Sequence, residues 1–268
     1  MMVMLFVLLC VLLYLFLIMP NPNRRKHEDL DGYLYAHRGL WNDERPENSL
    51  SAYQAAVSHG YGIELDVRMT KDQALVILHD ADALRMCGTH ARICDSFLSE
   101  LMELKLKGTG QGIPRLEDAL SLIAGKVPLI VEIKTCRDIH TLCRLTADML
   151  ETYDGPYCIE SFDPRAVRWF RIHRPNVLRG QLVFGRRGQE ASHSASALYA
   201  LALESMVENC LGRPDFIAMD WRCTDALPFR IVRKLFHPWL VAWTVSDQRT
   251  LQKYQDIYDL IIFEGFEP

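Results

Sequence analysis

Two carboxylates stand two residues apart in an apolar stretch of this 268-residue sequence, which reads IELDV at positions 63–67. On a β-strand successive side chains point to opposite faces, so Glu64 and Asp66 would emerge side by side on one face. Neighbouring like charges at the edge of a core are costly to desolvate unless one is protonated or a cation lies between them. A hard divalent cation, Ca²⁺ or Mg²⁺, is the simplest resolution, and the stretch therefore predicts a metal site. Taken alone, such a pair would more often belong to a solvated sheet face.

Five further polar residues follow other apolar stretches and complete a set suited to phosphate chemistry: His37, Arg38, His79, Glu132 and Lys134. Glu132 would add a third oxygen ligand, and the metal would draw charge from a phosphate oxygen. Arg38 and Lys134 could bind the remaining phosphate oxygens, since Arg offers a planar fork of donors and Lys a point charge. One imidazole could take a proton from the attacking oxygen while the other gives one to the leaving alkoxide.

The elements that must position these side chains are predicted as strands that alternate with helices. Eight apolar runs are predicted as parallel strands, at residues 34–37, 62–67, 129–134, 157–161, 179–183, 216–219, 239–245 and 260–263. This alternation indicates a TIM (β/α)8 barrel, an α/β fold whose catalytic groups gather at the carboxyl ends of its strands. An open doubly wound sheet is the alternative, but the sequence has no G-x-G-x-x-G turn between a strand and a helix.

A further apolar run, Leu75–Leu78, follows the second strand too closely for a parallel crossover, which needs a dozen or more residues. We therefore expect an antiparallel β-hairpin that brings His79 back towards Glu64 and Asp66. The next segment, residues 81–113, combines a helical stretch with a glycine-rich tail. It is predicted to be a small inserted cap that shapes the pocket.

The amino-terminal segment predicts a membrane anchor. Residues 1–19 are almost wholly apolar and carry no charged side chain, which is about the length that a helix needs to cross a hydrocarbon core of ~30 Å, and Pro20 ends the run. Three basic residues at 24–26 follow directly, and the side rich in Lys and Arg normally stays in the cytoplasm. We expect a transmembrane helix at 1–20, a basic juxtamembrane linker at 21–32 and a catalytic domain at 33–268. The protein would be a single-pass membrane protein with this domain in the cytoplasm.

Composition narrows the range of partners. The eight cysteines include no C-x-x-C pair, which argues against a zinc ribbon and against a compact disulfide framework. The formal net charge of −4 argues against general nucleic-acid binding, because phosphate backbones call for a basic surface. The expected partners are a small substrate and the membrane, and no protein partner is predicted.

The polar motifs, taken in order, resemble those of the glycerophosphodiester phosphodiesterase family. They are HRG at 37–39, PEN at 46–48, ELDV at 64–67, HD at 79–80, IP at 113–114, EIK at 132–134, SF at 161–162 and WTV at 243–245. The resemblance spans nearly everything after the apolar segment and is closest to membrane-anchored members of bacterial type. It implies a TIM barrel that hydrolyses glycerophosphodiesters to glycerol 3-phosphate and an alcohol.

Analogy with related barrels makes His37 the base and His79 the acid, although the sequence permits the reverse. The attacking oxygen could be water or the glycerol 2-hydroxyl. One departure concerns Glu264: the family's last strand often ends in an acidic residue directly after a threonine, whereas here Glu264 follows Phe263. The role of Glu264 therefore stays open.

Two other functions fit the same residues. A lysophospholipase D that acts on lysophospholipids at the membrane surface would share the mechanism and differ in the alcohol and acyl groups it accepts. A membrane-tethered binding barrel without turnover is the second alternative, but the metal and histidine positions are all chemically competent. Phe162, Trp221 and Trp243 are candidates to line the apolar part of the pocket, although strand aromatics also suit a core.

Overall fold

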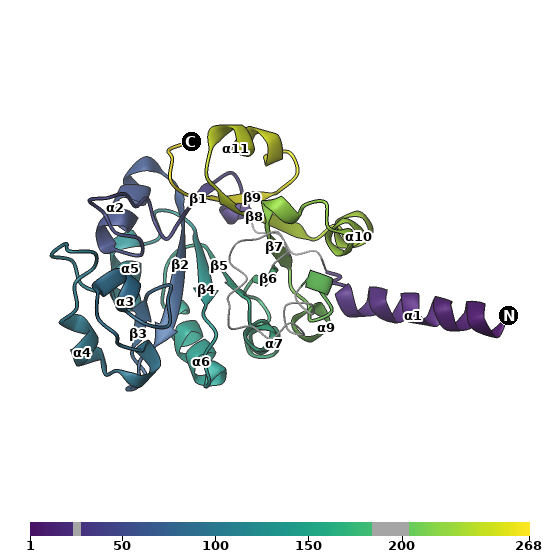
Figure 1. The fold of residues 1–268 in the computed structure, drawn as a ribbon, viewed down its shortest axis with the longest axis horizontal. Helices are drawn as coiled ribbons and strands as arrows, with labels where there is room; N and C mark the ends of the chain where they lie inside the picture. The colour runs from purple at the N-terminus through teal and green to yellow at the C-terminus, as the bar shows by residue number, and fades with distance from the viewer. Residues whose placement is uncertain (24–27, 184–203) are drawn as a thin grey trace.

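The computed structural model describes residues 1–23, 28–183 and 204–268, and within them eight parallel strands close into a barrel (Figure 1). The strands are β1 (Leu34–His37), β2 (Gly62–Met69), β4 (Leu129–Ile133), β5 (Tyr157–Ser161), β6 (Arg179–Val183), β7 (Phe216–Asp220), β8 (Trp239–Val245) and β9 (Leu260–Phe263). They pair in the order β1-β9-β8-β7-β6-β5-β4-β2, and β1 also pairs with β2. This last pairing closes the ring, so the open-sheet alternative is excluded. The prediction of a closed parallel barrel is confirmed, in agreement with a TIM architecture.

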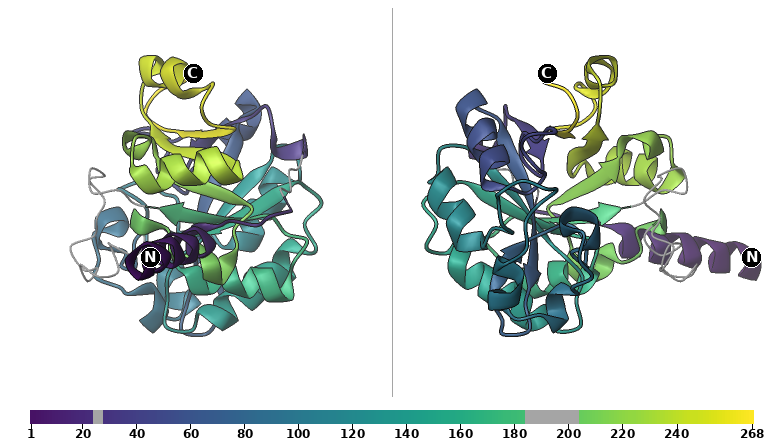
Figure 2. Two further views of the ribbon diagram at one scale, coloured as in Figure 1. Left: turned by 90° about the vertical axis from the view of Figure 1, so that its right-hand side faces the viewer. Right: turned by 60° about the vertical axis from the view of Figure 1, so that its left-hand side comes forward.

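Helices that follow the strands cover the outside of the barrel (Figure 2). They are α2 (Leu50–His59), α5 (Leu116–Ile123), α6 (Ile139–Leu150), α7 (Pro164–His173), α9 (Asn209–Gly212), α10 (Leu227–Phe236) and α11 (Gln248–Tyr254). Capping residues explain the limits of α2. Its first turn donates a backbone hydrogen bond to the side chain of Ser49, and it ends at Gly60, whose φ of 73° is a left-handed conformation that glycine adopts freely.

A buried apolar cluster occupies the barrel interior and includes Tyr35, Phe216, Val241 and Trp243. Gly180 on β6 makes room for the ring of Phe216, because a Cβ atom built at Gly180 would lie 2.0 Å from Cε2 of Phe216. Each fully buried side chain of this size stabilises the fold by roughly 1.5–3 kcal/mol. The filled interior keeps the carboxyl ends of the strands in fixed register.

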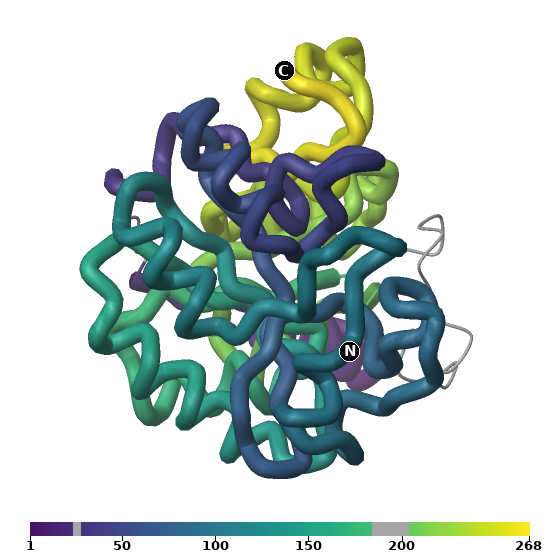
Figure 3. Tube along the Cα trace, turned by 90° about the vertical axis from the view of Figure 1, so that its left-hand side faces the viewer, coloured from purple at the N-terminus to yellow at the C-terminus, as the bar shows by residue number. Residues whose placement is uncertain are grey.

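The antiparallel hairpin expected after β2 is confirmed. Strand β3 (Leu75–Ile77) pairs with β2 so that Ile77 lies opposite Val67. Residues 81–113 then form short helices that pack around an apolar cluster of their own, which includes Met86 and Leu101. These short helices are α3 (Leu84–Cys87), the 3-10 helix η2 (Ile93–Asp95) and α4 (Leu98–Met102). Another 3-10 helix, η1 (Glu28–Leu30), precedes β1. Helices α3 and α4 lie on the side of the barrel away from α1, and Figure 3 views the molecule from that side.

The expected transmembrane anchor at residues 1–20 is wrong, and the membrane localisation inferred from it is overturned with it. The amino-terminal helix α1 (Met2–Ile18) has 17 residues, and at 1.5 Å per residue it measures about 25 Å, short of the ~30 Å hydrocarbon core. Among the described residues, none of the helices combines the length and the apolar character needed to span a bilayer. The basic residues 24–26 lie outside the described residues.

The carboxyl end of α1 packs against the barrel instead of ending free (Figure 2). Asn209 Nδ2 donates to the carbonyl oxygen of Ile18 at 2.9 Å, and Arg213 Nη1 donates to that of Met19 at 2.6 Å. Ile18 is fully buried. These contacts take up the carbonyl groups that the last helical turn leaves unpaired.

Candidate active site

The carboxyl ends of β1, β2 and β4 bring three carboxylates and a histidine together. Parallel pairing sets His37 beside Glu64, and Asp66 beside Glu132. Glu64, Asp66 and Glu132, hereafter the acidic trio, are buried, and one oxygen of each lies within 4.8 Å of the others. Three oxygen donors at this spacing suit a hard divalent ion, so the acidic trio could hold Ca²⁺ or Mg²⁺.

Burial makes the charges of the acidic trio costly, with opposite results for two of its members. Burial, reinforced by the charges of Asp66 and Glu132, raises the pKa of Glu64 well above its usual range. Burial also opposes ionisation of Asp66, but Lys134 and the other cations around it hold the pKa of Asp66 well below its usual range. A divalent cation would remove the penalty on Glu64, because a nearby opposite charge favours the ionised form.

The two predicted phosphate-binding cations flank the acidic trio. Lys134 Nζ lies 3.0 Å from Asp66 Oδ1 and 2.8 Å from Glu132 Oε1. Arg38 Nε lies 3.5 Å from Asp66 Oδ2, and Arg38 Nη1 donates to Glu47 Oε1 at 2.9 Å. Both cations are buried, so their charges would act on a phosphate group with little screening by water.

Glu264, to which the sequence assigned no role, lies against His37. Its Oε2 atom lies 2.7 Å from His37 Nδ1, while the other ring nitrogen, Nε2, lies 3.9 Å from Glu64 Oε2. The two residues meet because β9 pairs with β1. Burial opposes ionisation of Glu264, but the hydrogen bond and charge of His37 lower the pKa of Glu264. An ionised Glu264 accepts the proton of Nδ1, and this directs Nε2 towards the acidic trio.

His79 has a carboxylate partner of its own, which the insertion holds in place. Asp80 Oδ1 lies 2.8 Å from His79 Nδ1, and Arg85 Nε donates to Asp80 Oδ2 at 2.6 Å. Arg85 Nη1 also donates to Glu47 Oε2 at 2.9 Å, and Glu47 binds Arg38. Burial opposes ionisation of Glu47, but these hydrogen bonds and charges lower the pKa of Glu47 to about 2. Sequence reasoning missed Arg85, because no periodic pattern shows how the insertion folds back onto the barrel.

Asn48 is a second residue to which sequence reasoning gave no role. Its Nδ2 atom donates to Asp66 Oδ2 at 2.6 Å, and its Oδ1 atom accepts from Tyr53 Oη at 2.7 Å. Asn48 has φ 56°, a left-handed conformation in which asparagine is several-fold enriched. The turn before α2 therefore fixes one oxygen of Asp66 and leaves the other facing Lys134.

A small pocket of about 20 Å³ lies between the histidines and the acidic trio. It is lined by His37, Arg38, Glu64, His79, Glu132, Glu160, Phe162, Leu182, Trp243 and Ile262. Phe162 and Trp243 pack edge to face, with ring centroids 5.8 Å apart, and both line this pocket. Trp221 is not among these lining residues. Its indole Nε1 donates to the carbonyl oxygen of Thr244, and its ring joins the apolar cluster between strands and helices.

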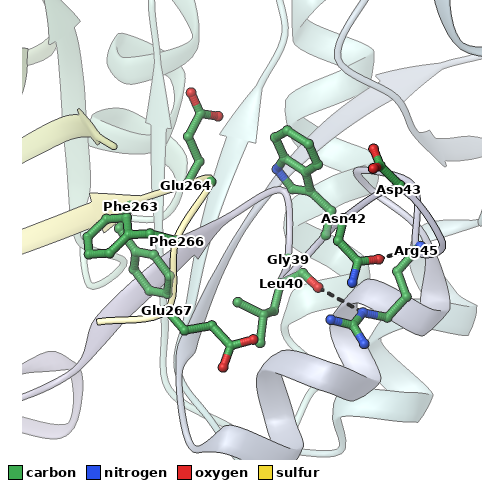
Figure 4. Close-up of a pocket in the computed structure, with 11 residues that line it drawn as sticks. Gly39, Leu40, Asn42, Asp43, Arg45, Phe263, Glu264, Phe266 and Glu267 are labelled. Carbon is green, nitrogen blue, oxygen red and sulfur yellow. Dashed lines mark hydrogen bonds between the residues drawn. The ribbon is translucent and has the colours of Figure 1, made fainter. Parts of the chain in front are cut away.

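A larger hollow of about 400 Å³ opens beside Glu264 (Figure 4). Its walls are residues 39–43 and Arg45, after β1, and residues 263–267, at and after the end of β9. Arg45 Nε donates to the carbonyl oxygen of Leu40 at 3.2 Å across one wall. Figure 4 shows the Glu264 side chain directed away from Phe266 and Glu267. Glu264 thus lines this hollow and also contacts His37.

Comparison with known proteins decides the family. The model of the glycerophosphoryl diester phosphodiesterase family matches residues 37–258 of this chain. The chain belongs to this family. It is accordingly a phosphoric diester hydrolase of the glycerophosphodiester phosphodiesterase type. The family is generally dependent on a divalent metal, and the acidic trio of this member has the donors that such an ion requires.

Relatives of this phosphodiesterase cover much of its length. YhdW of Bacillus subtilis, a candidate glycerophosphodiester phosphodiesterase, is 26% identical over 251 residues, which are 87% of this chain and 98% of that protein. The lysophospholipase D of Rattus norvegicus is 28% identical over 155 residues, which are 52% of this chain and 48% of that protein. A phosphodiesterase of Oleispira antarctica, solved with the product sn-glycerol 3-phosphate, superposes with a TM-score of 0.70 at 21% identity and covers 87% of this chain and 93% of that one. This last likeness supports the fold.

Proposed function

We propose that this phosphodiesterase uses a divalent metal and a pair of histidines to convert glycerophosphodiesters to glycerol 3-phosphate and an alcohol. The observation that carries the proposal is that His37, His79, Arg38, Glu64 and Glu132 all line one pocket at the carboxyl ends of the strands. One oxygen of Asp66 lies within 4.8 Å of an oxygen of each of these two carboxylates. The glycerol 3-phosphate bound to the Oleispira relative supports the choice of product. The catalytic domain would be residues 33–268, with 81–113 as its insertion.

Arg38 and Lys134 bind the phosphate in this mechanism. Each is already oriented by carboxylates, Arg38 by Glu47 and Lys134 by Glu132, so little side-chain entropy is lost when phosphate oxygens arrive. A bound Ca²⁺ or Mg²⁺ on the acidic trio would supply Lewis-acid polarisation of a non-bridging oxygen. Asn48 keeps Asp66 in the orientation that both tasks require.

His37 is the base and His79 the acid. Glu264 occupies Nδ1 of His37, so Nε2 is free to take the proton of the attacking oxygen, which is water or the glycerol 2-hydroxyl. Asp80 occupies Nδ1 of His79 in the same way, so its Nε2 can give a proton to the leaving alkoxide. The two carboxylates also stabilise the imidazolium form of each ring.

The proposal is tested by assaying the purified full chain with sn-glycero-3-phosphocholine. Hydrolysis should release glycerol 3-phosphate and choline, stop after exhaustive chelation and return when Ca²⁺ or Mg²⁺ is added. Full activity after chelation would show that the acidic trio does not act through a metal. Release of phosphocholine instead of glycerol 3-phosphate would refute the assigned bond cleavage.

A lysophospholipase D activity is the second candidate. The similarity to the rat lysophospholipase D favours it, and so does the apolar half of the pocket, formed by Phe162, Leu182, Trp243 and Ile262. The same assay with 1-acyl lysophosphatidylcholine separates the two functions. A higher kcat/KM for the lysophospholipid than for glycerophosphocholine would make this second function the main one.

A further inference from the structure

Glu160 is a further carboxylate in the pocket, and the mechanism above does not use it. It lies on β5, beside Glu132 of β4 in the parallel register, and is 1% exposed. Its Oε2 atom is buried and has no hydrogen-bond partner among the described residues. Glu160 nevertheless lines the small pocket together with both histidines.

A buried carboxylate oxygen without a partner is costly and uncommon, so its position calls for an explanation. The nearest cation of the site, Lys134, is already paired with Asp66 and Glu132. On the other side of Glu160 the paired residue is Gly180, which has no side chain to offer. The open direction for Glu160 is therefore the pocket itself.

The surroundings of Glu160 indicate the kind of group that would meet it. The apolar side chains of Phe162, Leu182 and Trp243 line the same pocket. The free space of about 20 Å³ is enough for one group the size of a hydroxyl or a water. The end of a short carbon chain that carries a hydroxyl suits both kinds of lining residue. Its carbons can contact the apolar side chains while its O–H donates to the carboxyl group of Glu160.

Glu160 is also one strand farther round the barrel than Glu132 of the acidic trio. Neighbouring strands are about 4.8 Å apart. In a glycerophosphodiester held by its phosphate at the trio, the terminal glycerol hydroxyl lies three carbons from the ester oxygen and can reach across such a gap. We propose that Glu160 accepts a hydrogen bond from this terminal hydroxyl and thereby selects diesters with a free glycerol end. This inference rests on the proposed function and specifies its substrate.

A role as a fourth metal ligand is less well supported. Glu160 does not belong to the group whose oxygens lie within 4.8 Å of one another, which comprises Glu64, Asp66 and Glu132 among the described residues. Acceptance of a hydroxyl proton, in contrast, needs no metal and is possible for a carboxyl group in either protonation state. The inference also has a consequence for lysophospholipids, because a 1-acyl chain replaces the hydroxyl that Glu160 would bind.

The test compares two phosphocholine diesters on the full chain, one of glycerol and one of propane-1,2-diol. The second keeps the 2-hydroxyl, so it remains a substrate whether water or that hydroxyl attacks, and it lacks only the terminal hydroxyl. Wild type should prefer the glycerol diester. Glu160→Leu should reduce the ratio of the two kcat/KM values about 3- to 10-fold, as expected for the loss of one hydrogen bond.

Two further variants separate recognition from structure. Glu160→Gln keeps a carbonyl acceptor of the same length and should retain most of the preference. Glu208→Gln is the matched control, because Glu208 is also buried with both carboxylate oxygens unpartnered among the described residues but does not line the pocket. It should leave the ratio unchanged. If Glu160→Leu does not fold, judged by circular dichroism, Glu160→Ala replaces it.

Each other outcome overturns the inference. An unchanged substrate ratio in a folded Leu or Ala variant would make Glu160 a structural residue. An equal loss with both substrates, together with a raised Ca²⁺ requirement, would make it a metal ligand. A wild-type enzyme that hydrolyses neither diester would refute the proposed function, whereas a wild type that hydrolyses both without preference would refute this inference alone.

Discussion

Each histidine of the site has a carboxylate at Nδ1, but the two carboxylates are held differently. Asp80 is fixed by Arg85, which itself binds Glu47. The side chain of Glu264 comes from the end of β9 and is 33% exposed. We therefore expect the orientation of His37 to depend on Glu264 more directly than on the rest of the barrel.

Removing either catalytic imidazole should leave the fold intact and abolish most turnover. His37→Ala and His79→Ala are each expected to lower kcat by roughly 10²–10⁴, the range typical of lost general acid or base catalysis. The measurement is steady-state hydrolysis of glycerophosphocholine, with circular dichroism to verify folding. His59→Ala is the control, because His59 is exposed, with Nδ1 against the carbonyl oxygen of Ala55 in its own helix and Nε2 3.9 Å from Glu267. Near-normal turnover in either variant would remove that histidine from the mechanism.

Glu264 should act on kcat through His37. Glu264→Ala frees the ring to rotate and is expected to lower kcat about 10- to 100-fold while KM changes little, because the substrate does not need this carboxylate for binding. Glu264→Gln retains an oxygen acceptor for Nδ1–H and should recover part of the loss. Glu267→Gln removes a neighbouring acid from the same segment and should have no effect. A change confined to KM would instead place Glu264 in substrate binding.

At the scale of elements, one ionic network joins the insertion to the barrel. Arg85 on α3 binds Glu47 in the loop before α2, and Glu47 binds Arg38 after β1. Through Glu47 the insertion contacts Arg38, the proposed phosphate-binding side chain, and through Arg85 it also holds Asp80, the partner of His79.

Stability should report this network through the titration of Glu47. Its folded pKa of about 2 lies below the ordinary glutamate value of 4.5, so its contribution is fully present above about pH 4.5 and is lost as the pH falls towards 2. The shift corresponds to a contribution on the order of 3 kcal/mol. The difference in unfolding free energy between wild type and Glu47→Gln, measured with urea, should therefore shrink across this acid range. A difference that stays constant would show that Glu47 titrates normally in the folded protein.

At the scale of the whole molecule, the barrel buries more negative charge at the acidic trio than Arg38 and Lys134 balance. The unfavourable free energy of ionisation falls mainly on Glu64, because its burial and the neighbouring carboxylates disfavour its charged form. An ion that binds only the folded state stabilises it by mass action.

Divalent metal should accordingly raise the unfolding temperature. At a free concentration 100-fold above Kd the gain is about 2.7 kcal/mol, which corresponds to several degrees for a chain of this size. Calorimetry with and without Ca²⁺ or Mg²⁺ measures the shift, and Glu132→Gln should remove most of it. An equal shift in Glu132→Gln would mean that the ion binds elsewhere.

The sequence by itself determined the barrel and most of the site, because both depend on local patterns. Apolar runs of strand length define the strands, and polar residues at their ends must meet once parallel strands close. Glu64, Asp66 and Glu132 could thus be grouped before any distance was known. The prediction for α1 was wrong because it used only the apolar composition of the segment, which is a local property. The contacts of Asn209 and Arg213 with the last turn of α1 come from far along the chain, so no local pattern indicates them.

Tertiary structure decided the contacts between residues that no periodicity relates. Glu264 meets His37 across 227 positions because β9 closes the barrel against β1. Arg85 reaches Glu47 because the insertion packs on its own apolar cluster and turns back. The Oε2 atom of Glu160 has no hydrogen-bond partner among the described residues, because Gly180 lies beside it and Lys134 is paired with two other carboxylates. Such placements depend on closure and packing over long sequence separations, and these are properties of the assembled barrel rather than of any segment in it.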